Sequence, residues 1–377
     1  MTTTAALLAR VHREEWARVV AAVARRFADL DIAEEAAAEA FLTAVERWPD
    51  DGVPPNPGAW LTTTAHRKAI DRIRRDAKRE AKYAEASRLT APAAPLRAVE
   101  DGRAIEDDRL RLIVTCCHPG LPMPARVALT LRMVGGLTVP QIAHAFMVSE
   151  TAMSRRITRA KSTIRAAGIP WDEPLEADLA PRIAGVLSVI YLIFNEGYLS
   201  SGPAGGPVRT DLATEAIHLG RVIHALRPGE DETAGLLALM LLIHARRDAR
   251  VSADGALVPL DAQDRGRWDK ELIAEGHALV RTCLDSGRPP GRYQILAAIN
   301  AVHTDAATFA DTDWSQVLAL YDQLAHLDPS PVVRLNRAVA VAELHGPAAA
   351  LALVDPLPLG DYHAYHATRA DLLRRQG

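Results

Sequence analysis

The spacing of apolar residues between Leu137 and Arg165 predicts two short helices joined by a tight turn. Thr138 and Gln141 have the three-residue spacing of a capping box, and Pro140 falls in the first turn, where a missing N–H matters little. Ser149 restarts the chain as an N-cap. Apolar residues then recur at helical intervals: Met153, Ile157, Ala160 and Ile164. The pattern is typical of a helix-turn-helix.

The opposite face of the second helix is polar and cationic. At about 100° per residue, this face carries Thr151, Ser154, Arg155, Thr158, Arg159 and Ser162, with Arg156 on the flank. Arginine can reach guanine edges in the major groove, and hydroxyls can reach bases or phosphates. The face therefore predicts a DNA-reading surface. The alternative interpretation, a merely solvated helix face, is less favoured because a capped helix and a short turn precede it.

An acidic amphipathic helix is expected from Asp31 to Trp48. Its apolar residues share one face: Ile32, Ala36, Ala40, Phe41, Ala44 and Val45. Its carboxylates decorate the remainder: Glu34, Glu35, Glu39 and Glu46. The next ten residues, Pro49 to Gly58, contain four prolines and two glycines, a composition that predicts a loop without regular structure.

A second basic helix is expected from Ala59 to Tyr83. It holds eight cations against three acids: Arg67, Lys68, Arg72, Arg74, Arg75, Lys78, Arg79 and Lys82. Trp48 and Trp60 bracket the preceding loop, and aromatic rings beside a cationic groove can stack on unpaired bases. The alternative is that both tryptophans belong to the core and the cations are only solvated.

The two basic helices are separated by a predicted linker. Residues 89–104 mix proline, alanine and acids without an apolar period, which is typical of a connector. Helices are then expected at 105–115 and 125–133, the second ended by Gly135 and Gly136. Residues 105–170 would form a compact helical DNA-binding module that includes the helix-turn-helix.

The remainder of the chain, residues 171–377, shows a degenerate helical repeat. The spacing of a tetratricopeptide second helix fits Ala216, Gly220, Ile223 and Pro228, and again Val317, Tyr321, Leu324 and Pro329. Residues 251–266 interrupt the repeat as a loop. We expect eight to ten stacked helices that present a concave surface to a peptide or protein. An enzymatic interpretation has less support, because scattered histidines come with no nucleophile, phosphate loop or paired-ligand motif.

Composition narrows the class of protein further. Among 377 residues, 49% are hydrophobic, 24% charged and only 5% aromatic, so an all-α globular chain is expected. No signal peptide and no membrane-spanning run are recognisable, which favours the cytoplasm. Three cysteines provide no disulfide framework. Cys116, Cys117 and His118 invite a zinc interpretation, but three adjacent residues cannot easily surround a tetrahedral ion, so neither a metal nor another cofactor is expected.

Charge is divided unevenly along the chain. Residues 1–170 carry 26 Lys/Arg and 20 Asp/Glu, a net charge of +6, whereas residues 171–377 carry 18 and 27, a net charge of −9. A basic half joined to an acidic half indicates that the first half meets nucleic acid and the second does not.

These blocks together resemble bacterial sigma-70 type sigma factors of the extracytoplasmic-function (ECF) group. The acidic helix resembles the region-two helix that docks on the β′ clamp helices of RNA polymerase. The basic helix after it resembles the segment that contacts and melts the minus-ten promoter element. The second helix of the helix-turn-helix resembles the region-four helix that reads the minus-thirty-five element. Segments 191–198, 335–343 and 365–375 resemble an ECF subgroup with a tetratricopeptide-like C-terminal extension.

The resemblance implies roles for individual residues. Polymerase contact would involve Glu34, Glu35, Glu39 and Phe41. The minus-ten segment would comprise Trp60, His66, Arg67, Lys68, Asp71, Arg72, Arg74 and Arg75, with a flipped base in the loop 49–58. The minus-thirty-five element would meet Thr151, Ser154, Arg155, Arg156, Thr158 and Arg159.

The implied function is promoter recognition without catalysis. Residues 1–88 would be region two, residues 105–170 region four, and residues 171–377 a helical regulatory domain. The implied partners are core RNA polymerase, through its β′ clamp helices and β flap, promoter DNA, and a regulatory protein or peptide bound by the C-terminal domain. The alternative is a helix-turn-helix regulator with a ligand- or peptide-sensing helical domain, which would not need the acidic helix or the tryptophan-flanked loop.

Overall fold

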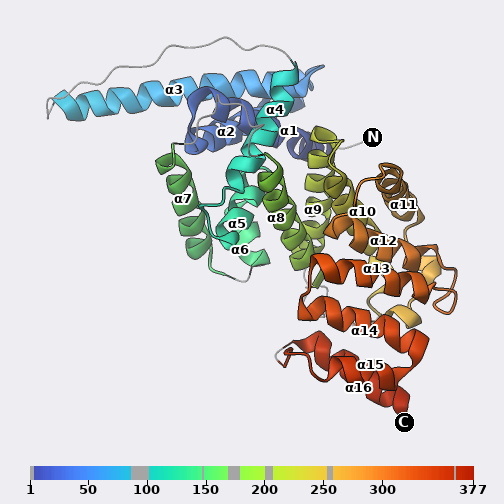
Figure 1. Ribbon diagram of the computed structural model, residues 1–377. Coiled ribbons are helices and arrows are strands. Elements are labelled where there is room, and N and C mark those ends of the chain that lie inside the picture. Colours follow the sequence, from blue (N-terminus) through green and yellow to red (C-terminus); the bar gives the residue numbers. More distant parts are fainter. Residues whose placement is uncertain are drawn as a thin grey trace. The chain divides into compact units, whose positions relative to one another are not determined.

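The computed structural model describes residues 4–85, 102–146, 148–168, 179–199, 207–252, 258–360 and 362–377. Within these ranges the regular structure consists of sixteen α-helices and three short 3-10 turns, with no β-strand (Figure 1). The predicted all-α class is therefore confirmed. The chain divides into two compact units, residues 1–196 and residues 197–377.

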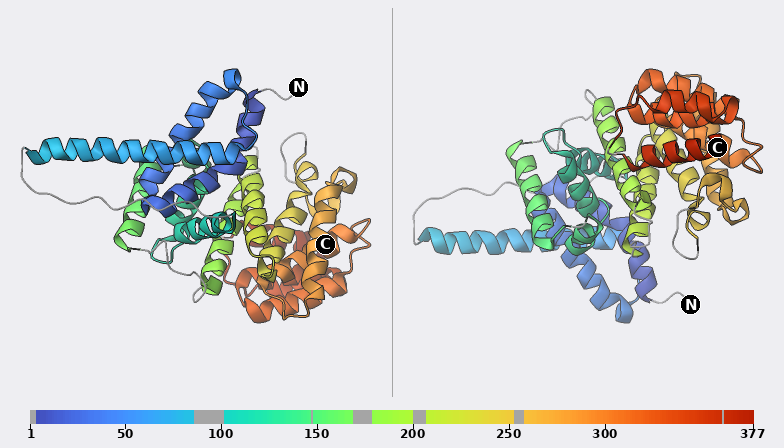
Figure 2. Two further views of the ribbon diagram at one scale, coloured as in Figure 1. Left: turned by 90° about the horizontal axis from the view of Figure 1, so that it is seen from above. Right: turned by 90° about the horizontal axis from the view of Figure 1, so that it is seen from below.

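Three helices open the first unit: α1 (Thr4–Phe27), α2 (Leu30–Asp51) and α3 (Pro57–Glu85). They pack on one another around small side chains. The fully buried residues of α2 include the alanines 33, 37, 40 and 44, which let neighbouring helices approach closely. Asp29 caps α2, because its carboxylate accepts hydrogen bonds from the N–H groups of Asp31 and Ile32 at 2.7 and 3.1 Å. The long α3 extends beyond the other helices of this unit (Figure 2).

The predicted loop at residues 49–58 was too long at both ends. Helix α2 continues through Pro49 to Asp51 and ends at Gly52, whose φ is 80°. A proline three residues from the end of a helix removes only one late hydrogen bond, so the helix tolerates it there. Pro57 begins α3, where the missing N–H has no intrahelical partner to lose. The connection between the helices is therefore only residues 52–56.

Four further helices form the helix-turn-helix part of the first unit: α4 (Gly102–Cys116), α5 (Met123–Met133), α6 (Val139–Ala145) and α7 (Glu150–Ala166). Helix α4 begins three residues before its predicted start, and residues 89–101 of the predicted linker lie outside the described residues. The capping box of α6 is complete, since Thr138 and Gln141 each accept a hydrogen bond from the other's backbone N–H. The Ser149 hydroxyl accepts the N–H of Ala152 at 3.2 Å and begins α7.

Helix α8 (Leu179–Leu199) crosses the division between the units. Most of its apolar residues between Val186 and Phe194 are buried, although Leu192 is 42% exposed. The second unit then continues with a series of helices: α9 (Pro207–Leu226), α10 (Asp231–His244), α11 (Lys270–Asp285), α12 (Arg292–Asp305), α13 (Trp314–Leu327), α14 (Pro331–His345), α15 (Pro347–Val354) and α16 (His363–Gln376). From α12 onward each helix packs on the next. No helix within the described ranges is both long enough and apolar enough to cross a membrane.

The segment between α10 and α11 contains no α-helix among its described residues. It holds the 3-10 turns η2 (Arg247–Ala249), η3 (Leu260–Ala262) and η4 (Arg265–Arg267). This arrangement agrees with the interruption predicted at 251–266. The two predicted copies of the repeat fall on α9 and α13, with Pro228 and Pro329 just beyond the end of each helix. Ala216, Ile223, Val317 and Leu324 are all buried.

Candidate DNA and polymerase interface

Helix α7 presents its predicted reading face to solvent. Met153, Ile157, Ala160 and Ile164 are buried, so the apolar stripe packs inward against α5 and α6. The residues predicted to meet the minus-thirty-five element lie on the other side: Thr151, Ser154, Arg155, Thr158 and Arg159 are exposed, and Arg156 is half-buried. An exposed row of hydroxyls and guanidinium groups on a capped helix is sterically free to enter a major groove.

The five cations of α3 whose side chains the structure describes divide into two groups. Lys68, Arg72 and Arg75 face the carboxylates of α2: Lys68 Nζ lies 3.5 Å from Glu39, Arg75 lies 3.9 Å from Glu39, and Arg72 pairs with Glu35. Arg67 and Arg74 are exposed and pair with no described residue. Arg67 and Arg74 are therefore available to a polyanion without the loss of an ion pair. Lys68, Arg72 and Arg75 would each have to exchange a carboxylate for a phosphate.

The aromatic residues of the predicted minus-ten segment differ in accessibility. Trp48 is buried and Trp60 is half-buried, with their rings edge to face at a centroid separation of 5.5 Å. Trp48 is thus a core residue, as the alternative interpretation held, while Trp60 keeps part of its ring accessible. His66 lies against α1, with its ring 6.3 Å from that of Phe27. Burial is the main cause that lowers the pKa of His66 below its ordinary value, so the ring stays neutral.

The polymerase-facing residues predicted on α2 are not all at the surface. Phe41 is only 8% exposed, and its ring contacts those of His12 and Trp16 at 4.8 and 5.8 Å, so it is placed in the core. Conversely, Val45 was predicted to lie on the buried face, yet it is 51% exposed. Val45 lies about one turn from both Phe41 and Leu42, so the helical period alone does not show that it falls outside the buried face.

The exposed face of α2 combines apolar and acidic groups. Leu42 is 58% exposed, and together with Val45 it forms a short apolar row flanked by Glu35, Glu39 and Glu46. Large apolar side chains that remain exposed on a helix with acidic neighbours are typical of a protein-docking surface. The sequence pattern did not indicate Leu42, because the family resemblance assigned the polymerase contact to its neighbour Phe41.

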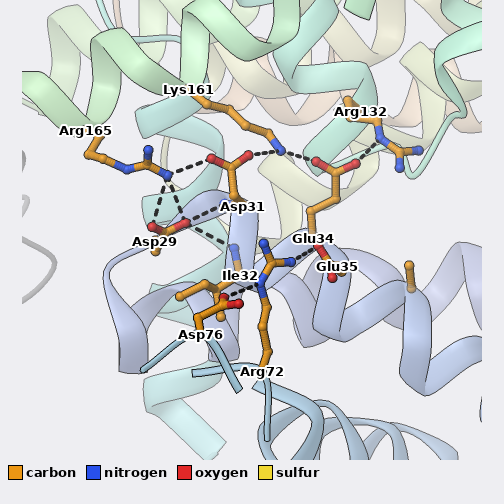
Figure 3. Close-up of a pocket in the computed structure, with 11 residues that line it drawn as sticks. Asp29, Asp31, Ile32, Glu34, Glu35, Arg72, Asp76, Arg132, Lys161 and Arg165 are labelled. Atoms are coloured by element: carbon orange, nitrogen blue, oxygen red, sulfur yellow. Dashed lines mark hydrogen bonds and ion pairs between the residues drawn. The ribbon is translucent and has the colours of Figure 1, made fainter. Parts of the chain in front are cut away.

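A polar cleft of about 640 Å³ lies where α2 meets α3, α5 and α7. Six of its residues form what we term the charged seam: Asp29, Asp31 and Glu34 opposite Arg132, Lys161 and Arg165 (Figure 3). Lys161 Nζ lies 2.9 Å from Asp31 and also pairs with Glu34. Arg132 Nε lies 2.5 Å from the other oxygen of Glu34. Arg165 reaches Asp29 at 3.0 Å and Asp31 at 2.6 Å.

The cations of the seam stabilise the ionised form of Asp31. Burial by itself raises the pKa of Asp31, but hydrogen bonds and charges from Lys161 and Arg165 outweigh it, so the pKa lies below its ordinary value. Of the seam's six residues, only Glu34 was singled out from the sequence as a site residue. The one signal for Lys161 was a lysine directly beside the apolar stripe of α7, at a position that a solvated charge would avoid.

The cysteine pair at 116 and 117 is structural. Both side chains are buried, and burial raises the pKa of Cys117 to about 11 and that of Cys116 well above its ordinary value. Thiols held protonated in this way are poor nucleophiles. Within the described ranges, no cluster of three or more His, Cys, Asp or Glu side chains is arranged to hold a metal ion.

Protein-family models match both parts of the chain that carry an exposed cationic helix face. Residues 13–79 match the sigma-70 region 2 family and residues 111–164 match the sigma-70 region 4 family. Residues 182–284 match a family of unknown function (DUF6596). The first two matches coincide with α1–α3 and with α4–α7, the helices that carry the two exposed cationic faces.

Similar proteins extend these matches. An uncharacterized protein of Rhizobium meliloti (strain 1021) is 46% identical over 365 residues, which cover 96% of this chain and 86% of that protein. The ECF RNA polymerase sigma factor SigK of Mycobacterium ulcerans is 30% identical over 152 residues, 39% of this chain and 78% of SigK. SigK of Mycobacterium tuberculosis is 30% identical over 155 residues, with the same shares covered. No solved structure matches the chain.

The chain contains two sigma-70 regions in the expected order, and it is similar to SigK over most of SigK's length. These findings favour a sigma factor over an ordinary helix-turn-helix regulator. The chain is a DNA-binding, RNA polymerase-binding protein of transcription initiation, and it belongs to the ECF RNA polymerase sigma factors.

Proposed function

We propose that the sigma factor divides promoter recognition between α3 and α7. Helix α7 would read the minus-thirty-five element through Ser154, Arg155 and Arg159, whose side chains are exposed on one face. Helix α3 would hold the melted minus-ten strand through Arg67 and Arg74, with Trp60 as the stacking platform. The observation that carries this proposal is the presence of two exposed cationic helix faces, one in each matched sigma region.

Core polymerase would bind the exposed face of α2. Burial of the Leu42 and Val45 side chains against the partner would stabilise the complex. Glu35, Glu39 and Glu46 would match the charge of a basic partner. By the family resemblance this partner is the pair of β′ clamp helices, while the region-four helices would meet the β flap. Phe41 supports this face from beneath rather than touching polymerase.

The second unit would regulate initiation. Its helices carry the two copies of the tetratricopeptide spacing, and the small residue expected at the helix crossing is Gly220, where an added Cβ would lie 2.6 Å from Met240 Cε. Such close helix packing supports a tetratricopeptide-like solenoid, whose usual ligand is a peptide or protein segment. Residues 197–377 also carry 17 Lys/Arg and 22 Asp/Glu, a net charge of −5, which suits a basic ligand.

Run-off transcription with the full chain and core polymerase tests the promoter roles. Replacing Arg155 and Arg159 by alanine should reduce transcripts from promoters that depend on the minus-thirty-five element by roughly 10- to 100-fold, about 1–3 kcal/mol. Replacing Arg67 and Arg74 should instead slow strand opening. Unchanged start-site choice in both variants would reject the assignment. Deleting residues 171–377 and finding unchanged transcription and regulation would reject a control role for this part of the chain.

A further inference from the structure

A cavity of about 200 Å³ lies within the second unit, among helices α10, α11, α12 and α13 (Figure 1). Residues of all four helices line it, together with residues of the segment that joins α11 to α12. Most of the lining side chains are apolar: Val280, Leu284, Ile295, Ala297, Ala298 and Leu320. The chemistry of this cavity therefore differs from that of the charged cleft in the first unit.

The close packing of α10 on α12 fixes two walls of the cavity. Gly235 lies so near α12 that an added Cβ would be 2.7 Å from both the backbone nitrogen and Cγ of Gln294. On the α12 side, Ala297 and Ala298 have short side chains at positions where a larger residue would occupy the space. The cavity therefore results from small residues on helices that cannot move closer to each other.

The cavity has a buried floor and an exposed rim. Cys283, Gln294 and Ile295 are all buried and form part of the floor. At the rim, Arg288 is exposed and Leu284 is 69% exposed, an unusual position for a leucine side chain. A ligand can therefore enter from solvent, pass an apolar rim and lose most of its contact with water at the floor.

Gln294 supplies one hydrogen-bond acceptor to the floor. Its side chain is only 9% exposed, and its Nε2 donates to Glu232 Oε1 at 3.4 Å, which anchors the amide group. The amide oxygen of Gln294 accepts no hydrogen bond from any residue that the structure describes. Such an acceptor in a buried side chain is costly to leave unpaired, and a hydroxyl or N–H group of a ligand would satisfy it.

The thiol of Cys283 contributes to the cavity as a small apolar group. Its Sγ donates to the carbonyl oxygen of Asp231 at 3.6 Å. Burial, together with the nearby carboxylates of Asp231 and Glu232, raises the pKa of Cys283 to about 11. The thiol therefore stays protonated at neutral pH and is a poor nucleophile, so the cavity is suited to reversible, non-covalent binding.

We propose that this cavity binds a small, uncharged aromatic molecule whose single hydroxyl or N–H group donates to the amide oxygen of Gln294. One ring suits the size, because an apolar cavity of about 150 Å³ binds benzene, whereas drug-sized ligands occupy pockets of about 300 Å³ or more. The guanidinium of Arg288 at the rim is already paired with Asp231 at 2.5 Å, so it does not require an anionic ligand. The proposal is independent of the promoter contacts, which lie in the first unit.

Phenol is the probe for the ligand class, because it is one ring with one hydroxyl group. Calorimetry and ligand-observed NMR on the full chain should show saturable binding to one site, with a Kd of about 0.1–1 mM for so small a molecule. Gln294→Met keeps the side-chain volume but removes the acceptor. It should weaken phenol binding by about 3- to 10-fold and leave the affinity for toluene, a ring of similar size without a donor, unchanged.

Changes in the volume of the cavity provide a second readout. Ala298→Leu should fill part of the space and weaken phenol binding by about 10-fold or more. Leu320→Ala should enlarge the space, so that 2-naphthol binds about 5-fold more tightly than it binds the wild type. Ala278→Leu is the matched control, because Ala278 is an exposed residue of α11 that does not line the cavity. Hydrogen exchange of α12 verifies that each variant is folded.

Three results would overturn the proposal. The first is the absence of saturable binding of phenol to the wild-type chain at millimolar concentration. The second is binding that Ala298→Leu and Leu320→Ala leave unchanged, since the ligand would then lie elsewhere. The third is an equal loss of phenol and toluene affinity in Gln294→Met, which would reject the hydrogen bond that defines the ligand class.

Discussion

The indole ring of Trp60 lies edge to face against that of Trp48, with their centroids 5.5 Å apart, where α2 gives way to α3. Trp48 is buried, whereas Trp60 is half-buried. The inner ring therefore serves as a fixed support, and the outer ring retains an accessible surface beside the exposed cations of α3. A pair of this kind can present one ring to an unstacked base without an entropy cost for ordering it.

We expect Trp60→Ala to slow promoter opening while core binding is unchanged. Base–aromatic stacking contributes about 1–3 kcal/mol per base, so the open-complex fraction should fall by roughly 5- to 100-fold. Permanganate reactivity of unpaired thymines measures this directly. Trp60→Phe should restore most of the signal, because it keeps a stacking surface. Trp48→Ala should instead destabilise the fold by about 3–5 kcal/mol, and equal effects of the two alanine variants on thermal unfolding would contradict this division.

The exposed apolar row of α2 leads to a second prediction. Leu42→Asp should weaken binding to core polymerase by roughly 30-fold, since a centrally placed apolar anchor contributes about 2 kcal/mol to an interface. The fold should be unaffected because the side chain is already exposed. Leu327→Asp, an equally exposed leucine of the second unit, is the control. Equal loss of affinity in both variants would indicate a general solubility effect rather than a docking face.

Local signals explain most of what could be predicted from the sequence. Thr138, Gln141 and Ser149 act within three residues of their partners, so the helix-turn-helix and its exposed face follow from spacing alone. The proline-rich composition predicts that α2 ends before Pro49, whereas the helix continues to Asp51. The actual cost of Pro49 depends on how near the helix end it lies, which composition does not reveal.

Long-range contacts explain what the sequence could not show. Lys161 and Asp31 are 130 positions apart, and nothing in either local pattern indicates the pairing. The same holds for Phe41 and Val45, whose burial depends on which side of α2 meets α1. An amphipathic pattern with alanine on several sides leaves that orientation undetermined, so the docking face could be placed on α2 but not on particular residues.

Gly136 offers a test of the apolar contact between the two sigma regions. Its φ of +71° disfavours any side chain, and its added Cβ would collide with His12 and Trp16. Gly136→Ala should therefore separate region four from region two and lower thermal stability by about 1–3 kcal/mol. Gly168→Ala is the matched control, because its φ is +58° but no atom lies within 4 Å of the added Cβ. An equal loss of thermal stability in both variants would show that backbone strain, not the contact, is responsible.

His303 makes the second unit sensitive to pH. Burial lowers the pKa of His303 to about 4, and the guanidinium groups of Arg246 and Arg265 act in the same direction. An unfolded chain protonates histidine near pH 6.5, so the folded unit loses stability as the pH falls from about 6.5 towards 4. The loss at pH 5.5 should be about 1 kcal/mol. Above pH 7 no loss is expected.

His303→Phe should remove this part of the pH dependence without harm at neutral pH. The Nδ1 atom of the ring is buried without a hydrogen-bond partner among the described residues, and the neighbouring Trp314 ring, 5.2 Å away, can pack on phenylalanine equally well. Hydrogen-exchange mass spectrometry of α12 in urea, at pH 7.5 and 5.5 and corrected for intrinsic rates, follows this unit specifically. His326→Gln, at an exposed position of α13, should leave the pH dependence unchanged. If the wild type and His303→Phe lose equal stability between the two pH values, protonation of His303 is not the cause.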